Sequence, residues 1–230
     1  MNGDLTPPNT TQGNSDLLEP KIWTVGQTLR ISFIGTTGDA LKKAIYDTAC
    51  EWSKYANLNF ERVDDNEGSA EIRIFAYSKI HYGFDADVHV LATETGERPS
   101  SNMNFVFETE SIGDPGFVAT ILIEFGRILG MEPAQFHPEA NIPWNFDSLR
   151  KLVRSTLDEQ ASDAEVEEAL RSRMPPITGK VQLSLGYDIK SIMHVPISTE
   201  ITVGGWKSEL NSTLSEKDKR FMALVYPGRS

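Results

Sequence analysis

A carboxylate and a guanidinium stand one helical turn apart in the most apolar segment of the sequence. Glu124 and Arg127 have i,i+3 spacing, so both side chains fall on neighbouring positions of one helix face. Two interpretations follow. In the first, Glu124 acts as a general acid or base and Arg127 anchors a carbonyl, enolate or phenolate oxygen. In the second, the two charges only neutralise each other, because an unpaired charge inside a protein is costly.

The elements that must position this pair have clear sequence patterns. Four segments carry the apolar spacing of half-buried strands: 29–33, 58–60, 72–74 and 103–107. The last of them is expected at a sheet edge. An apolar stripe over 39–52 predicts an amphipathic helix. Residues 117–129 predict a second, buried helix, with Gly130 at its C-terminal end.

The second half of the chain is less regular. Helices are expected at 148–157, from the capping box at 162–165 to Arg173, and from 214–218 to a point before Pro227. Residues 78–101 and 178–206 are expected to be irregular. This order predicts an α+β fold with a twisted N-terminal sheet, two long helices and an irregular C-terminal lobe.

The predicted domain organisation is simple. Residues 1–20 are polar and rich in Pro, Asn and Thr, which indicates a flexible arm. Residues 21–230 form one domain, with an N-lobe of about 21–130 and a C-lobe of about 131–230.

Several short motifs occur in a fixed order along this domain. They are Trp23-(x)2-Gly26-(x)2-Leu29-Arg30-Ile31-Ser32-Phe33, Ala49-(x)2-Trp52, Leu58-Asn59-Phe60, Ile72-Arg73-Ile74, Ser191-Ile192-Met193-His194, and Leu214-Ser215-(x)2-Asp218 with Tyr226-Pro227. Together they resemble the astacin-type zinc metallopeptidases of the metzincin clan, and Ser191–His194 resembles the Met-turn of that clan. The resemblance extends over roughly residues 21–228.

The zinc motif of this family, H-E-x-x-H-x-x-G-x-x-H-E, aligns with residues 123–134, which read IEFGRILGMEPA. Glu124 and Gly130 match the motif, but the three ligand positions hold Ile123, Arg127 and Pro133. Zinc needs lone pairs on nitrogen, sulfur or oxygen, which these side chains do not offer. The sequence therefore predicts no metal, no cofactor and no peptide hydrolysis by the family mechanism.

The vacated cleft leads to two functional hypotheses. In the first, Glu124 and Arg127 are catalytic residues in metal-independent chemistry on a small apolar organic molecule. A cyclase of the hetero-Diels–Alderase type in fungal natural-product biosynthesis is the favoured example. In the second, a pseudopeptidase binds an extended peptide or a protein partner by strand addition near Phe105. The expected ligand-binding residues are Ile123, Phe105, Tyr187, His194 and Val195. Glu132 is expected to be a solvated loop charge.

Composition excludes several partners. The net charge is −11, with 22 basic and 33 acidic residues, so the surface repels the phosphates of nucleic acids. No apolar run reaches the ~18 residues of a membrane span, so no membrane association is expected. The chain has one cysteine, Cys50, and its N-terminus lacks the pattern of a secretory signal. These features predict a cytoplasmic protein.

Overall fold

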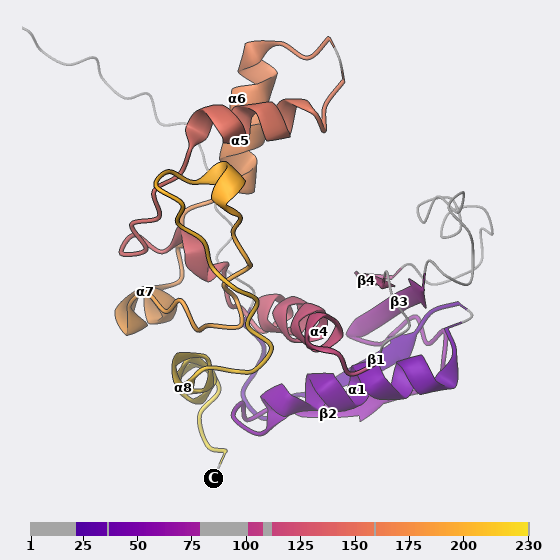
Figure 1. Ribbon diagram of the computed structural model, residues 1–230. Coiled ribbons are helices and arrows are strands. Elements are labelled where there is room, and N and C mark those ends of the chain that lie inside the picture. Colours follow the sequence, from indigo (N-terminus) through magenta and orange to yellow (C-terminus); the bar gives the residue numbers. More distant parts are fainter. Residues whose placement is uncertain (1–21, 36, 79–100, 108–111, 159, 230) are drawn as a thin grey trace, which may run out of the picture.

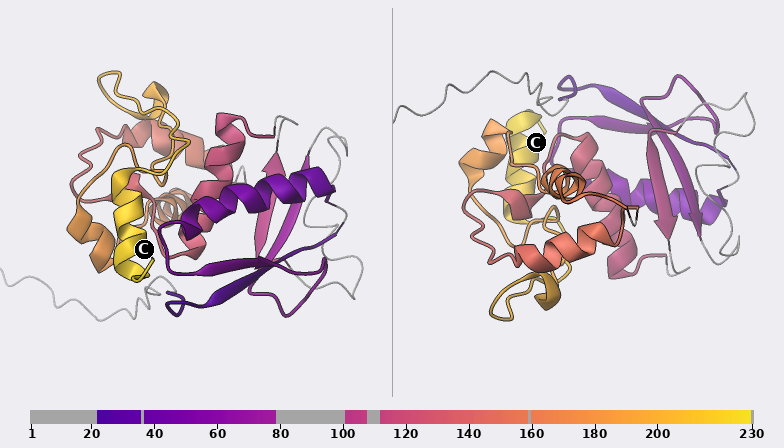
Figure 2. Two further views of the ribbon diagram at one scale, coloured as in Figure 1. Left: turned by 90° about the horizontal axis from the view of Figure 1, so that it is seen from below. Right: turned by 90° about the horizontal axis from the view of Figure 1, so that it is seen from above.

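The N-terminal half folds as a parallel sheet packed against two long helices (Figures 1 and 2). The computed structural model describes residues 22–35, 37–78, 101–107, 112–158 and 160–229. The predicted arm at 1–20 and nearly all of the predicted loop at 78–101 lie outside these residues. The α+β class and the two long helices are confirmed within them.

The described sheet has four strands, all of which pair in parallel in the order β2-β1-β3-β4. Their bounds are Thr28–Phe33 for β1, Asn59–Arg62 for β2, Ile72–Ser78 for β3 and Met103–Phe107 for β4. All four predicted strands are therefore confirmed. In the described sheet β4 is an outer strand, and its residues alternate between buried Met103 and Phe105 and exposed Asn104.

The two long helices are amphipathic, and each buries one face. Helix α1, Asp39–Ser53, buries Ile45, Ala49 and Trp52. Helix α4, Pro115–Ile128, is capped by Asp114, whose side chain accepts a hydrogen bond from the backbone N–H of Phe117. The helices contact each other, and the indole N–H of Trp52 donates to the carbonyl of Leu122 at 3.0 Å. This contact fixes α4 relative to the sheet.

Helix α4 ends in a Schellman motif, as its glycine predicts. Gly130 has a φ of 91°, in the left-handed region, and its N–H donates to Arg127 O. The N–H of Met131 donates to Gly126 O at 2.9 Å. The chain thus reverses sharply after the helix and enters the C-terminal lobe.

The C-terminal lobe consists of short helices joined by long connections. They are η1 Ala134–Phe136, α5 Phe146–Arg154, α6 Asp163–Arg173, α7 Lys180–Leu185, η2 Thr199–Ile201 and α8 Glu216–Val225. Helices α5 and α6 form a separate small core and stand at one end of the molecule, away from the sheet (Figure 1). None of the described helices is long and apolar enough to cross a membrane.

Two of the predicted C-terminal elements differ in the structure. Helix α7 lies inside 178–206, which was expected to be irregular, because its N-terminus is held by a distant side chain, that of Glu132. Helix α5 begins at Phe146 and not at Ser148, since Asn145 is the residue that caps it. The capping boxes of α6 and α8 are both present, as their local sequences predict.

Residues near both ends of the described chain contact the C-terminal end of α4. The indole N–H of Trp23 donates to Ile128 O at 2.9 Å, and the hydroxyl of Tyr226 donates to Leu129 O at 3.0 Å. Tyr226 also accepts a backbone hydrogen bond from Asn57. Segments from both ends of the described chain therefore satisfy the last carbonyls of this helix.

Gly126 provides a test of this packing. A Cβ at this position would lie 2.6 Å from Met193 Sδ and 3.1 Å from a Trp52 ring carbon, whereas a Cβ at Gly116 meets only Asp114 Oδ1, at 3.5 Å. Gly126→Ala is expected to lower the free energy of unfolding by about 1–3 kcal/mol through overpacking. Gly116→Ala on the same helix is expected to leave it unchanged or raise it by up to about 1 kcal/mol. Urea unfolding of both variants measures this, and equal effects would contradict the close packing.

Candidate functional site

Glu124 and Arg127 form an ion pair on the outer face of α4. Arg127 Nη1 donates to Glu124 Oε1 at 2.6 Å. The opposite face of the helix, which includes Ile121, Leu122 and Phe125, is buried in the core. The amphipathic pattern of α4 therefore presents the two charges away from the core.

The ion pair is accessible to solvent. The side chain of Arg127 is 46% exposed and that of Glu124 is 34% exposed. An exposed i,i+3 pair contributes only about 0.3–0.5 kcal/mol to stability. Because both charges reach solvent, neither needs the other to offset the cost of burial. One carboxylate oxygen and most of the guanidinium N–H groups bond to no other protein group among the described residues. The pair thus offers a hydrogen-bond acceptor beside several donors.

The Met-turn, Ser191–His194, packs directly against α4. Met193 is 1% exposed, and its sulfur lies over Gly126. The carboxylate of Asp218 on α8 holds this turn by accepting from Ser191 Oγ at 2.6 Å and from Ile192 N at 2.8 Å. Burial raises the pKa of Asp218 despite these donors. The Met-turn is therefore in direct contact with the helix that carries Glu124.

Tyr187 and His194 form a hydrogen-bonded pair beside the turn. Tyr187 Oη and His194 Nε2 are 2.9 Å apart, and His194 Nδ1 is 3.0 Å from Val195 O. A carbonyl only accepts, so Nδ1 carries the proton and Nε2 accepts from the tyrosine hydroxyl. Burial lowers the pKa of His194 and raises that of Tyr187. Both groups are therefore neutral near pH 7.

The sequence matches no family model, and a search of curated proteins finds no significant match. Solved structures do match. Two structures of myroilysin are 28% identical over 90% of this chain, with TM-scores of 0.66 and 0.58 and coverage of 96% and 86% of the myroilysin chains. High choriolytic enzyme 1, a hatching enzyme zinc-protease of the medaka fish Oryzias latipes, is 14% identical over 95% of this chain and 98% of its own, with a TM-score of 0.49.

The likeness to myroilysin, an astacin-family metzincin protease, extends over both lobes and agrees with the observed contact between α4 and the Met-turn. This chain has an astacin-like metzincin fold. The shared fold supports the resemblance seen in the sequence motifs. In that motif alignment, Ile123, Arg127 and Pro133 stand at the ligand positions of the family's zinc motif.

The zinc ion of astacin-type metallopeptidases does not fit these residues. The side chains of Ile123 and Pro133 have no donor atom, and the Arg127 guanidinium is a fixed cation that is bonded to Glu124. In the nearby Met-turn, the free lone pair of His194 accepts from Tyr187. In the part of the chain that the structure describes, no group of three or more His, Cys, Asp and Glu side chains could hold a metal.

The other expected ligand-binding residues lie in different surroundings. Phe105 is 1% exposed and stacks on Phe107 in the core, so only its backbone on β4 can reach a ligand. Ile123 is half-buried and packs against the same core. Val195 is half-buried, and its carbonyl accepts from His194 and from Ser208 Oγ. The catalytic and ligand-binding roles of these residues remain predictions.

The expectation for Glu132 is wrong. Its carboxylate accepts hydrogen bonds from Thr178 N, Thr178 Oγ1 and Gly179 N, at distances from 2.7 to 3.1 Å. These donors stand 46 or 47 residues away in the sequence, so no local pattern could indicate them. Glu132 is a structural residue that fixes the start of α7.

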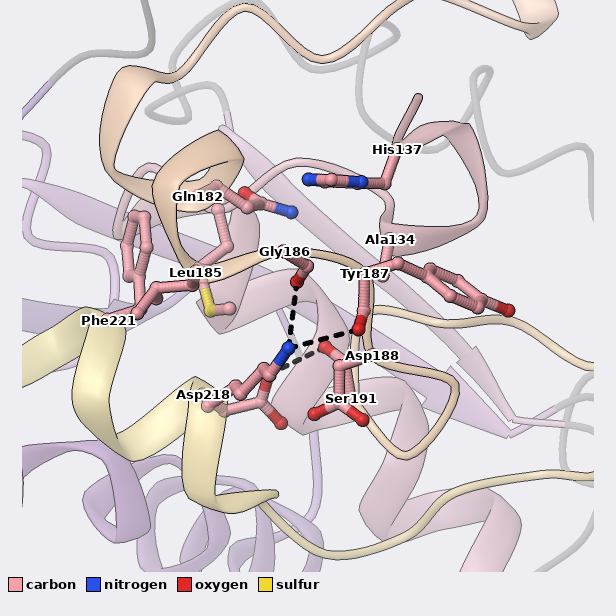
Figure 3. Close-up of a pocket in the computed structure, with 12 residues that line it drawn as sticks. Ala134, His137, Gln182, Leu185, Gly186, Tyr187, Asp188, Ser191, Asp218 and Phe221 are labelled. Carbon is pink, nitrogen blue, oxygen red and sulfur yellow. Dashed lines mark hydrogen bonds between the residues drawn. The ribbon is translucent and has the colours of Figure 1, made fainter. Parts of the chain in front are cut away.

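A pocket that the sequence did not predict lies between η1, α7 and α8 (Figure 3). Of the expected site residues, only Tyr187 lines it. His137 and Gln182 also line it, and both are buried polar residues. Neither residue belongs to a recognisable motif, so only the folded chain reveals them.

The side chains at positions 123, 127 and 133 predict the zinc content of the purified protein. The wild-type protein is expected to purify with far less than one zinc per chain, because these side chains provide no ligand. The triple variant Ile123→His/Arg127→His/Pro133→His restores three imidazoles and is expected to bind about one zinc per chain. Elemental analysis checks both expectations. A chelator should lower the melting temperature of the variant and leave that of the wild type unchanged. Stoichiometric zinc in the wild type would contradict the prediction.

The lowered pKa of His194 predicts a pH dependence of stability. Above about pH 6.5, the ordinary pKa of histidine, the residue is neutral in the folded and the unfolded chain, so it adds no slope. Below that pH the unfolded chain takes up the proton first, and the free energy of unfolding falls until the folded pKa is passed. Urea unfolding between pH 8 and pH 5 measures this fall.

Two variants identify the source of this slope. His194→Asn is expected to flatten the profile below pH 6.5. Tyr187→Phe loses the hydrogen bond but keeps the buried imidazole, so it should lower stability at every pH and retain the fall. An unchanged profile in His194→Asn would show that other groups cause the slope.

Proposed function

We propose that this protein binds extended peptide segments without hydrolysing them, and that the Glu124–Arg127 pair holds one peptide group of the ligand. The observation that carries the proposal is the exposed ion pair, in which Arg127 Nη1 and Glu124 Oε1 are 2.6 Å apart. A peptide group has a carbonyl acceptor and an N–H donor. The guanidinium can donate to the carbonyl, and the carboxylate can accept from the N–H of the same or the next residue.

The position of Arg127 supports this assignment. It stands at the second ligand position of the family's zinc motif, where a metal would polarise a substrate carbonyl. A guanidinium also places positive charge beside a carbonyl oxygen. It does not lower the pKa of water to the ~7 that a zinc-bound water has, so it supplies no hydroxide for hydrolysis. Under this proposal Arg127 therefore helps to bind the peptide but does not help to cleave it.

Strand β4 provides the second part of the proposed binding surface. It is an outer strand of the described sheet, and Asn104 is exposed between residues that are buried. An extended peptide can add to a sheet edge through main-chain hydrogen bonds, which are independent of the peptide's sequence. The ion pair on α4 would then select the register in which a peptide group faces it.

Metal-independent chemistry on a small apolar molecule is the second candidate. The apolar side chains of Ile123, Pro133 and Val195 favour it, because they replace polar residues of the family motifs. A cyclase of this kind also needs an enclosed apolar cavity. Among the described residues, the pocket of Figure 3 is lined by polar groups as well, and it does not include Glu124, Arg127 or Ile123. The peptide hypothesis therefore has the stronger support.

A peptide-array experiment tests the proposal. The full chain is screened against immobilised peptides, and the affinity of the best binders is measured by fluorescence polarisation. Arg127→Leu and Glu124→Gln are each expected to weaken binding at least tenfold, because each removes one charge-assisted hydrogen bond to the peptide group. Mass spectrometry should find every peptide intact after incubation.

The matched control is another exposed i,i+3 pair. Arg171 donates to Glu168 on α6, with side chains 69% and 75% exposed. Arg171→Leu is expected to leave peptide affinity within twofold, and both arginine variants should melt within about a degree or two of the wild type. The proposal fails if no peptide binds, or if Arg127→Leu binds as tightly as the control. Conversion of an apolar polyene by the wild type, lost in Glu124→Gln, would favour the cyclase.

A further inference from the structure

The pocket between η1, α7 and α8 is lined by both apolar and polar side chains (Figure 3). The space inside it that a water-sized group can occupy is about 20 Å³, and the rest of the pocket is open to solvent. Met131, Ala134, Leu185 and Phe221 supply apolar surface. This space admits one small group such as a carbonyl oxygen, while the rest of a ligand lies in the open part of the pocket.

His137 brings an unpartnered N–H group to this pocket. The residue is 6% exposed, and its Nδ1 accepts a hydrogen bond from the backbone N–H of Glu139 at 3.1 Å. The neutral ring therefore carries its proton on Nε2. No protein group among the described residues pairs with Nε2. A buried N–H without an acceptor is costly, so this group favours a ligand that supplies one.

Gln182 presents a second donor near His137. Its Oε1 accepts from Glu132 N at 2.8 Å and its Nε2 donates to Glu132 O at 2.6 Å, which fixes the orientation of the amide. The remaining N–H of Nε2 is free of this pairing. In Figure 3 the His137 ring points toward the amide nitrogen of Gln182. One carbonyl oxygen has two lone pairs and can accept from both residues.

The charges around the pocket disfavour an anion. Asp188 and Asp218 line it, while the ammonium of Lys217 already donates to Gly186 O and Tyr187 O. The lining thus carries two carboxylates against one cation, so a carboxylate ligand meets net repulsion. A neutral carbonyl group satisfies the donors without this repulsion.

We propose that this pocket binds a small neutral carbonyl compound, such as an amide, whose oxygen accepts from His137 Nε2–H and Gln182 Nε2–H. The alkyl part of the ligand packs against Leu185 and Phe221. The site is separate from the Glu124–Arg127 pair, and the proposal does not depend on peptide binding there.

A titration of the full chain tests the proposal. The protein is labelled with ¹⁵N-histidine, and the imidazole resonances are followed by NMR while N-methylacetamide is added. A saturable shift of the His137 Nε2 resonance is expected. Acetate, an anion of similar size, is expected to bind at least tenfold more weakly.

Two variants examine the donors separately. His137→Phe keeps an aromatic ring without the N–H, and Gln182→Glu replaces the donor with a carboxylate. Each is expected to weaken binding of N-methylacetamide at least tenfold, measured on backbone amide shifts. Equal affinity in His137→Phe, or acetate binding as tight as the amide, would overturn the proposal. A wild-type Nε2 resonance that does not respond also overturns it, because the N–H is then satisfied by water alone.

Discussion

The arrangement of α4 and the Met-turn depends on the packing of one methionine over one glycine. Met193 fills the space that Gly126 leaves open on α4, and Trp52 of α1 closes the same space from the other side. A single atom at this glycine would disturb both contacts. The position of the Met-turn is therefore coupled to the position of α4 relative to the sheet. This coupling is independent of zinc, which explains how a metzincin fold persists with Ile123, Arg127 and Pro133 at the ligand positions.

The same contact explains why the ion pair faces outward. With Gly126 turned toward Met193, the helical repeat places Glu124 and Arg127 on a different face of α4. The two charges remain partly hydrated, so they cost little to maintain. They also keep most of their hydrogen-bonding groups available. A site of this kind binds by complementarity of donors and acceptors, without the strong polarisation that a metal provides.

Local patterns predicted most of the fold and, of the candidate site, the proximity of Glu124 and Arg127. The strands, α1, α4, α6 and the start of α8 were predictable because alternation, capping residues and Gly130 act over a few neighbouring positions. Glu124 and Arg127 were predictable for the same reason, since they share one helix turn. Helix α7 was not, because the Glu132 carboxylate that holds its start is 46 residues away. His137 gave no signal, since its role depends on a pocket whose walls come from separate segments.

Asp218 connects the last described helix, α8, to the Met-turn, although Ser191 and Ile192 lie 27 and 26 residues earlier in the sequence. Its carboxylate caps α8 through Ser215 N and at the same time holds Ser191 and Ile192 of the Met-turn. On the ribosome, α8 is made after every other helix of the described chain. The sheet and α4 can form while synthesis continues, but the Met-turn lacks its anchor until α8 emerges. In a nascent chain that stalls before this point, the apolar surface on which Met193 packs is less protected. Chaperones and quality-control proteases recognise such exposed apolar surfaces.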